Sequence, residues 1–61
     1  MLITVLEDLV GKEVEIMVGG HFFIGRITSV DPTGIVVFAD DEEPSRPYTI
    51  DAEHVQLVQP Q

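Results

Sequence analysis

The chain has 61 residues, 44% of them hydrophobic, and its 11 acidic residues against three basic ones give a net charge of −8 at pH 7. These values indicate one small globular domain over residues 1–61 and exclude an intrinsically disordered chain. The absence of cysteine excludes disulfides and thiolate metal sites, and no apolar run approaches the roughly 18 residues of a membrane span.

The first predicted element is a short α-helix over residues 4–10, where apolar residues recur near helical spacing. Thr4 stands three residues before Glu7, which fits a capping box. Glu7 and Asp8 then lie early in the helix, where the helix dipole favours acids, and Gly11 fits the position just past its end. We expect the apolar face of this helix to cover one end of a sheet.

Five short β-strands are predicted after the helix. Gly19 and Gly20 supply the positive φ values of a two-residue hairpin, and Asp31 to Gly34 has the composition of a turn. Because the connections are short, neighbouring strands are expected to be antiparallel. One helix followed by five short strands with turns between them therefore predicts a mainly β fold, either a small barrel or a sandwich. The predicted strands cover residues 13–18, 21–30, 35–39, 46–50 and 55–58, with a short turn, or one turn of 3₁₀ helix, before the last.

The second strand carries bulky apolar residues on both faces at its start. Phe23 and Gly25 share one face, while Phe22 and Ile24 share the other, so one of these faces is expected to be covered by another subunit. A glycine inside a strand, such as Gly25, usually marks a sharp bend or a close backbone approach.

Self-association is also expected from size. A chain of this length buries only about 60% of the surface that its unfolded form exposes, and such domains often need a disulfide, a metal or a partner subunit. The sequence offers no disulfide, and two histidines alone do not predict a zinc site. Oligomerisation is the remaining route to stability.

The loop over residues 39–47 contains four consecutive acids, Asp40 to Glu43. They lack the spacing and the glycine of a calcium loop, so a solvated loop is the favoured interpretation. An Arg- or Lys-rich peptide is the alternative ligand. His21 and His54 are expected at the surface, and base stacking or a metal contact by His54 is kept as an alternative.

The central stretch resembles the Sm and Sm-like (LSm) proteins, and the similarity extends over residues 2–58. Their first motif combines alternating apolar residues, a turn glycine, an aromatic residue, a second glycine and an aspartate at fixed intervals. The positions that carry the resemblance are Val14, Ile16, Val18, Gly20, Phe23, Gly25, Ile27, Asp31, Val36 and Phe38.

The resemblance implies a mainly β fold, with an N-terminal α-helix followed by a five-stranded, strongly bent antiparallel small β-barrel. It also implies a homo-oligomeric ring of about five to seven subunits, in which the fourth strand of one subunit pairs with the fifth strand of the next. Such pairing would cover the exposed sheet edges. The expected interface residues lie on these two strands and on the outer face of the second: Tyr48, Thr49, Ile50, Val55, Gln56, Leu57, Val58 and Phe22.

The resemblance also implies single-stranded RNA as a partner, although the base-binding positions depart from the family pattern. The stacking position falls at Thr33, the asparagine position at Ile35 and the arginine position at Asp51. A carboxylate in place of a guanidinium makes the pore rim negative, which is unfavourable for phosphates. Together with His54 and Arg26, these three are the candidate nucleic-acid-binding residues.

The sequence therefore supports two functions. The first is a ring-forming Sm-like scaffold in RNA binding or RNA processing, with the usual uridine site altered. The second is an acidic structural or adaptor ring that binds basic peptides of protein partners. No catalytic pattern stands out, so neither an enzyme nor a cofactor is expected. Without a secretory signal or a membrane span, a cytoplasmic location is expected, with no membrane partner.

Overall fold

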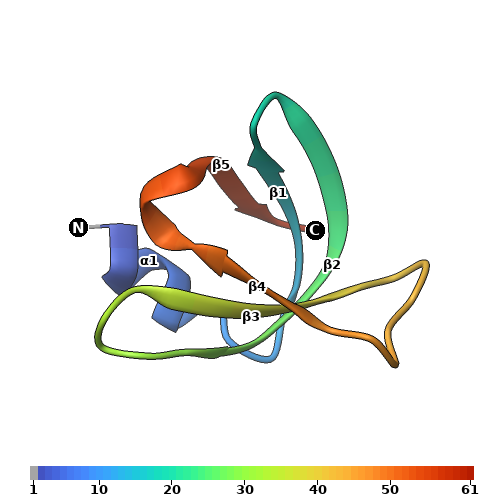
Figure 1. Cartoon of the computed structure of the whole chain (residues 1–61), viewed down its shortest axis with the longest axis horizontal. Helices are drawn as coiled ribbons and strands as arrows, with labels where there is room; N and C mark the ends of the chain where they lie inside the picture. Colours follow the sequence, from blue (N-terminus) through green and yellow to red (C-terminus); the bar gives the residue numbers. More distant parts are fainter. Residues whose placement is uncertain (1) are drawn as a thin grey trace.

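The computed structural model describes residues 2–61, which form one α-helix and one five-stranded antiparallel sheet (Figure 1). Among these residues, no helix has the length and apolar character needed to cross a bilayer. The elements in chain order are α1 (Leu2–Asp8), β1 (Glu13–Val18), β2 (His21–Val30), β3 (Ile35–Asp40), β4 (Tyr48–Asp51), the 3₁₀ helix η1 (Ala52–His54) and β5 (Val55–Pro60).

The helix begins and ends two residues earlier than predicted. Thr4 lies inside α1 and does not cap it, and the first turn contains no acidic residue. Glu7 and Asp8 are the last two helical residues, where the dipole disfavours acids. The position is set by packing, because Leu6 is fully buried against the sheet. The prediction relied on a local capping pattern that this tertiary contact overrides.

The predicted hairpin between β1 and β2 is confirmed. Gly19 and Gly20 have φ of 59° and 80°, and Val18 pairs with His21 across the turn. The ends of the later strands differ from the prediction by one or two residues. In particular, β4 begins at Tyr48 and not at residue 46, which is consistent with Pro47 lacking the N–H that would extend the ladder.

The long strand β2 curves from its pairing with β1 into its pairing with β3 (Figure 1). Gly25 lies in this bend, opposite Asp40. A β-carbon at Gly25 would come within 2.9 Å of the Asp40 Cα and 2.8 Å of the Phe38 Cζ. The predicted close approach at this glycine is therefore present.

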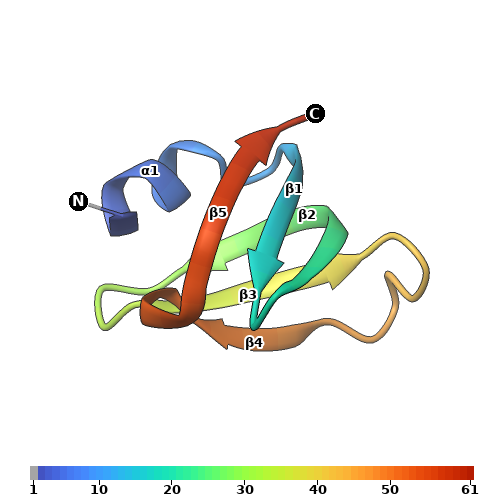
Figure 2. The same ribbon diagram turned by 90° about the horizontal axis from the view of Figure 1, so that it is seen from above.

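The predicted barrel is not closed. The strand order is β4-β3-β2-β1-β5, so β4 and β5 are the two edges of an open sheet and do not pair with each other. The reason lies in the connection between them. After only four residues β4 enters η1, and this turn carries the chain across the open side, so that β5 pairs with β1 (Figure 2).

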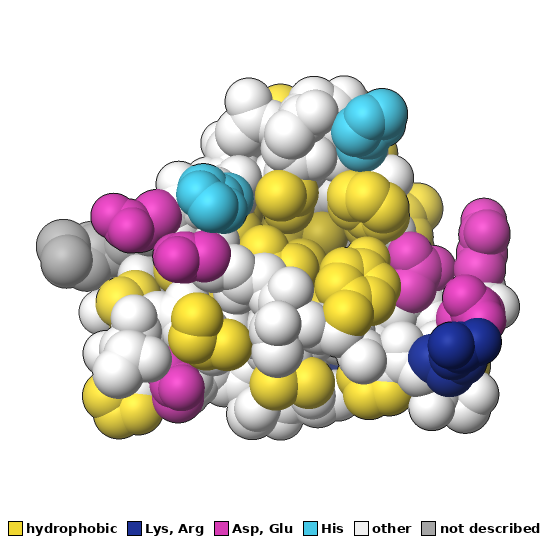
Figure 3. Space-filling model, in the orientation of Figure 1, with side chains coloured by type: hydrophobic (Ala, Val, Ile, Leu, Met, Phe, Trp, Pro, Cys, Tyr) yellow, Lys and Arg dark blue, Asp and Glu magenta, His cyan; other side chains and the backbone are white. Residues whose placement is uncertain are grey.

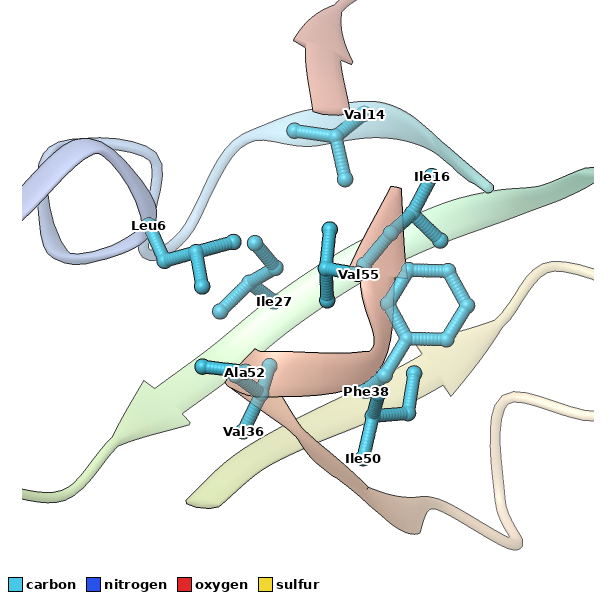
Figure 4. Close-up of a cluster of buried hydrophobic side chains, with 9 residues drawn as sticks. All are labelled: Leu6, Val14, Ile16, Ile27, Val36, Phe38, Ile50, Ala52 and Val55. Carbon is cyan, nitrogen blue, oxygen red and sulfur yellow. The ribbon is translucent and has the colours of Figure 1, made fainter. Parts of the chain in front are cut away.

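The core lies on the concave side of this curved sheet, with Leu6 of α1 at one end. Ile50 from one edge strand and Val55 from the start of the other both turn their side chains into it (Figure 4). The buried cluster consists of Leu6, Val14, Ile16, Ile27, Val36, Phe38, Ile50, Ala52 and Val55.

Candidate functional site

The turn between β2 and β3 lies against η1, which brings together segments about 20 residues apart in the chain. The Ala52 N–H donates to the Gly34 carbonyl at 2.8 Å, and Ile35 is the register partner of Asp51. This contact gathers four of the five predicted nucleic-acid-binding residues at one end of the molecule. They are Thr33, Ile35, Asp51 and His54.

Asp31 organises the β2–β3 turn. Its Oδ1 accepts hydrogen bonds from the Thr33 hydroxyl at 2.6 Å, the Thr33 N–H at 2.9 Å and the Ile35 N–H at 3.0 Å. The hydroxyl bond, followed by the backbone donors, lowers the pKa of Asp31 from its ordinary value. The Thr33 hydroxyl hydrogen is therefore directed to Asp31 and not to a ligand.

Asp51 caps η1, since its Oδ1 accepts a hydrogen bond from the Glu53 N–H at 2.9 Å. Asp51 and Ile35 are half-buried, whereas His54 is exposed. Of this group, His54 is the exposed side chain that has an aromatic ring for stacking. The carboxylate of Asp51 adds negative charge beside it.

Arg26 does not join this group. Its guanidinium donates to the Gly11 carbonyl and lies 3.7 Å from a carboxylate oxygen of Glu13. The positive charge of Arg26, which could attract a phosphate, is therefore held near the start of β1.

A second candidate site is a groove between the start of β2 and the loop that joins β3 to β4. Its two adjoining hollows have volumes of about 520 Å³ and 280 Å³. Figure 3 shows an apolar patch on the face of the molecule that is viewed in Figure 1, with acidic and basic side chains of the β3–β4 loop at the end of the patch. The hollows are lined by Phe22, Phe23, Ile24, Asp40, Asp41, Glu42, Glu43, Arg46 and Tyr48.

The aromatic wall of this groove is tied to the core. The Tyr48 ring packs edge-to-face on Phe23 at 6.4 Å and on the buried Phe38 at 5.8 Å between ring centroids. Phe22 and Ile24 remain exposed to 57% and 44%. The groove thus has a firmly packed wall and an apolar side that is open to solvent.

The acids of the groove create a negative field. Desolvation, followed by the charge of Asp40, raises the pKa of Tyr48. A side-chain hydrogen bond with Asp41 is the main cause that raises the pKa of Glu13, and the nearby Arg26 opposes it. Burial is thus the larger cause at Tyr48, and the carboxylates of Asp40 and Asp41 act in the same direction on their neighbours Tyr48 and Glu13.

The predicted interface residues fall into three sets. Tyr48, Thr49, Gln56 and Leu57 are exposed on the edge strands, and Val58 is half-buried. The side chains of Ile50 and Val55 are in the core of the same chain, so only their backbone can contribute to an edge contact. Phe22 lies in the groove and not on an edge strand.

The groove is not recognisable as one site from the amino-acid sequence alone. Its aromatic and acidic residues come from two segments that meet only in the fold, where the Asp41 N–H donates to the Ile24 carbonyl at 3.0 Å. The available signal was the pair Phe22 and Ile24 on the outer face of β2, which was interpreted as a subunit contact. Within residues 2–61, no group of three side chains is arranged to hold a metal ion.

Comparison of the chain with protein-family models, with curated proteins and with solved structures finds no match.

Proposed function

We propose that the protein is the subunit of an Sm-like homo-oligomeric ring that acts as a scaffold in RNA binding or RNA processing. The observation that carries this proposal is the open sheet, in which each of the two edge strands, β4 and β5, is paired along one side only within residues 2–61. Free edges are prone to pair with another chain. Pairing of β4 with β5 of the next subunit uses two different surfaces, and such a heterologous contact closes into a ring if the rotation permits.

The residues on the two edges support this arrangement. Leu57 on β5 is a large hydrophobic residue exposed to 41%, which a neighbouring subunit would cover. On β4 the Tyr48 ring lines the groove, so this strand would contribute its backbone edge and the exposed Thr49 to the contact. The small core gives a further reason to expect an oligomer. A 61-residue domain buries a smaller share of its surface on folding than a larger domain does, and a partner subunit would cover more of it.

The RNA role is supported by the juxtaposition of the β2–β3 turn with η1. A ring repeats this end of the molecule around its axis, so several copies of His54 would face one strand of RNA. In the proposed site, a base stacks on the His54 imidazole, because aromatic rings accept any base. The usual uridine pocket is altered, since Asp51 stands where the family pattern has a cation.

Two measurements test this proposal. Native mass spectrometry should give a closed oligomer, and a stable monomer at micromolar concentration would contradict the ring. Fluorescence anisotropy with short U-rich and A-rich RNA at about 0.1 M salt, where the oligomer is expected to form, should show binding that His54→Ala weakens by about fivefold or more. His21→Ala is the matched control, because it removes the other exposed imidazole. An absence of RNA binding by the assembled oligomer would contradict the RNA role and leave the ring untouched.

A second candidate function is an acidic adaptor ring that binds basic segments of protein partners. The groove between β2 and the β3–β4 loop favours it, because apolar and acidic side chains line the same hollow. Competition separates the two functions. RNA and a basic peptide should bind independently if they use the His54 end and the groove.

A further inference from the structure

The side chains that line the groove carry more negative charge than positive charge. Asp40, Asp41, Glu42 and Glu43 contribute four carboxylates, and Arg46 is the cation among the lining residues. Its guanidinium lies 3.7 Å from Glu43, and the two side chains are 80% and 68% exposed. Exposed pairs of this kind are weak, so Arg46 can move aside at little cost.

The aromatic wall stands beside these carboxylates. Phe22 is 57% exposed, and Tyr48 is 38% exposed and held in place by its contact with the buried Phe38. A cation over an aromatic face is attracted by the ring electrons, and its hydrocarbon stem covers apolar surface. A groove with both features matches a side chain that has a long apolar stem and a positive end.

We propose that this groove binds an arginine side chain presented by an extended, basic segment of a partner protein. The arginine stem packs along Phe22 and Ile24, and the planar guanidinium stacks on the aromatic wall while it donates to carboxylates of the β3–β4 loop. This inference rests on the adaptor function proposed above and names its ligand. Arginine is preferred over lysine because its planar, forked group stacks on rings and pairs with carboxylates in two directions.

Charge decides against the other occupants. Phosphates of RNA are repelled by a site with four carboxylates. A second copy of this chain carries a net charge of −8, and its Arg26 is already held by Gly11 and Glu13. Pairing along the β4 edge would leave the groove open, because its lining residues other than Tyr48 lie on β2, at the end of β3 and in the β3–β4 loop.

The test is a titration of the isotope-labelled, full-length protein followed by NMR. The probe is a blocked peptide of about ten residues with arginine at every third position in a flexible glycine–serine background. Saturable shifts are expected for the backbone amides of residues 22–24 and of the non-proline residues between 40 and 48. The lysine version of the peptide should bind about threefold or more weakly. Shifts scattered over the surface, or equal binding of both peptides, would overturn the proposal.

Variants separate the groove from general acidity. Glu42→Lys should weaken arginine-peptide binding by about fivefold or more. Glu7→Lys is the matched control, because it makes the same charge change on α1, at the other side of the molecule in Figure 1. Phe22→Ala should weaken binding by about threefold, and Val5→Ala is its control because Val5 is an exposed hydrophobic residue on α1. All four side chains are exposed, so folding should be retained.

The outcomes are distinct. Equal weakening by Glu42→Lys and Glu7→Lys would mean diffuse charge attraction and would overturn the site. Sedimentation of the same samples reports the oligomeric state separately. A monomer that binds the arginine peptide would refute the ring and support the groove, whereas a ring that does not bind it would refute the groove alone.

Discussion

Gly25 lies at the point where β2 passes closest to β3. A β-carbon there would overlap the Ala39 carbonyl oxygen and approach the Asp40 Cα to 2.9 Å, and these backbone atoms cannot rotate away. We expect Gly25→Ala to lower the free energy of unfolding by about 2–3 kcal/mol, a large share of what a small domain has. Urea unfolding followed by circular dichroism measures it. Ser29→Ala, at an exposed position of the same strand, should change it by less than about 0.5 kcal/mol. Equal effects of the two variants would contradict the close approach.

Asp31 should make stability depend on acid pH. Its folded-state pKa is lowered, first by the Thr33 hydroxyl and then by backbone N–H groups, so the ionised form stabilises the folded protein. This stabilisation is present above the unfolded-state pKa of about 3.9 and is lost as the pH falls through the lower, folded-state value. The wild type should therefore exceed Asp31→Ala in stability at pH 7, and this difference should shrink toward pH 2.

Thermal unfolding of both proteins between pH 7 and pH 2 measures this effect. In the Thr33→Val variant, which keeps the backbone bonds, an NMR titration should place the pKa of Asp31 closer to its ordinary value. Parallel pH curves for wild type and Asp31→Ala would show that the hydrogen bonds of this turn do not favour the ionised form.

The edge strands are the elements that the ring proposal depends on. Leu57 lies on β5 and is 41% exposed, so an aspartate there can stay hydrated in a single chain. In a subunit contact the same carboxylate would be buried without a partner, which is strongly unfavourable. We expect Leu57→Asp to yield folded monomers, as measured by sedimentation and circular dichroism. Val5→Asp, on α1 and 46% exposed, should leave the oligomer intact. An intact Leu57→Asp oligomer would place the interface elsewhere.

Local sequence patterns predict that a helix, strand or turn is present better than they predict the residues at which it begins and ends. The glycine hairpin and the turn from Asp31 to Gly34 were recognisable because positive φ and a side-chain acceptor are properties of single residues. The start of α1 was misplaced because burial of Leu6 determines it, and burial depends on the whole fold. The open sheet was missed for a similar reason, since alternation does not reveal whether two edge strands meet.

At the scale of the whole molecule, the sequence offers candidate residues, whereas their arrangement comes from the fold. Thr33 and Asp51 were assigned to one RNA site through the family resemblance, and the fold brings their segments together, while RNA binding there stays a prediction. The groove required a tertiary contact between β2 and the end of β3 that no spacing rule provides. Its acids were interpreted as a solvated loop and Phe22 as part of a subunit contact, because the sequence does not show that the two segments meet.

Net charge should control assembly. Subunits that each carry −8 repel one another, and an interface between edge strands must overcome that repulsion. Raising sodium chloride from about 0.01 M to about 0.1 M shortens the screening length from about 30 Å to about 10 Å. We therefore expect the oligomer to dissociate at the lower salt concentration and to form at the higher one, as measured by analytical ultracentrifugation at fixed protein concentration.

A variant with Glu7→Gln and Asp8→Asn, both on α1, should assemble at lower salt because it removes charge without touching either edge. Dissociation as salt rises would instead mean that ion pairs between subunits hold the assembly together.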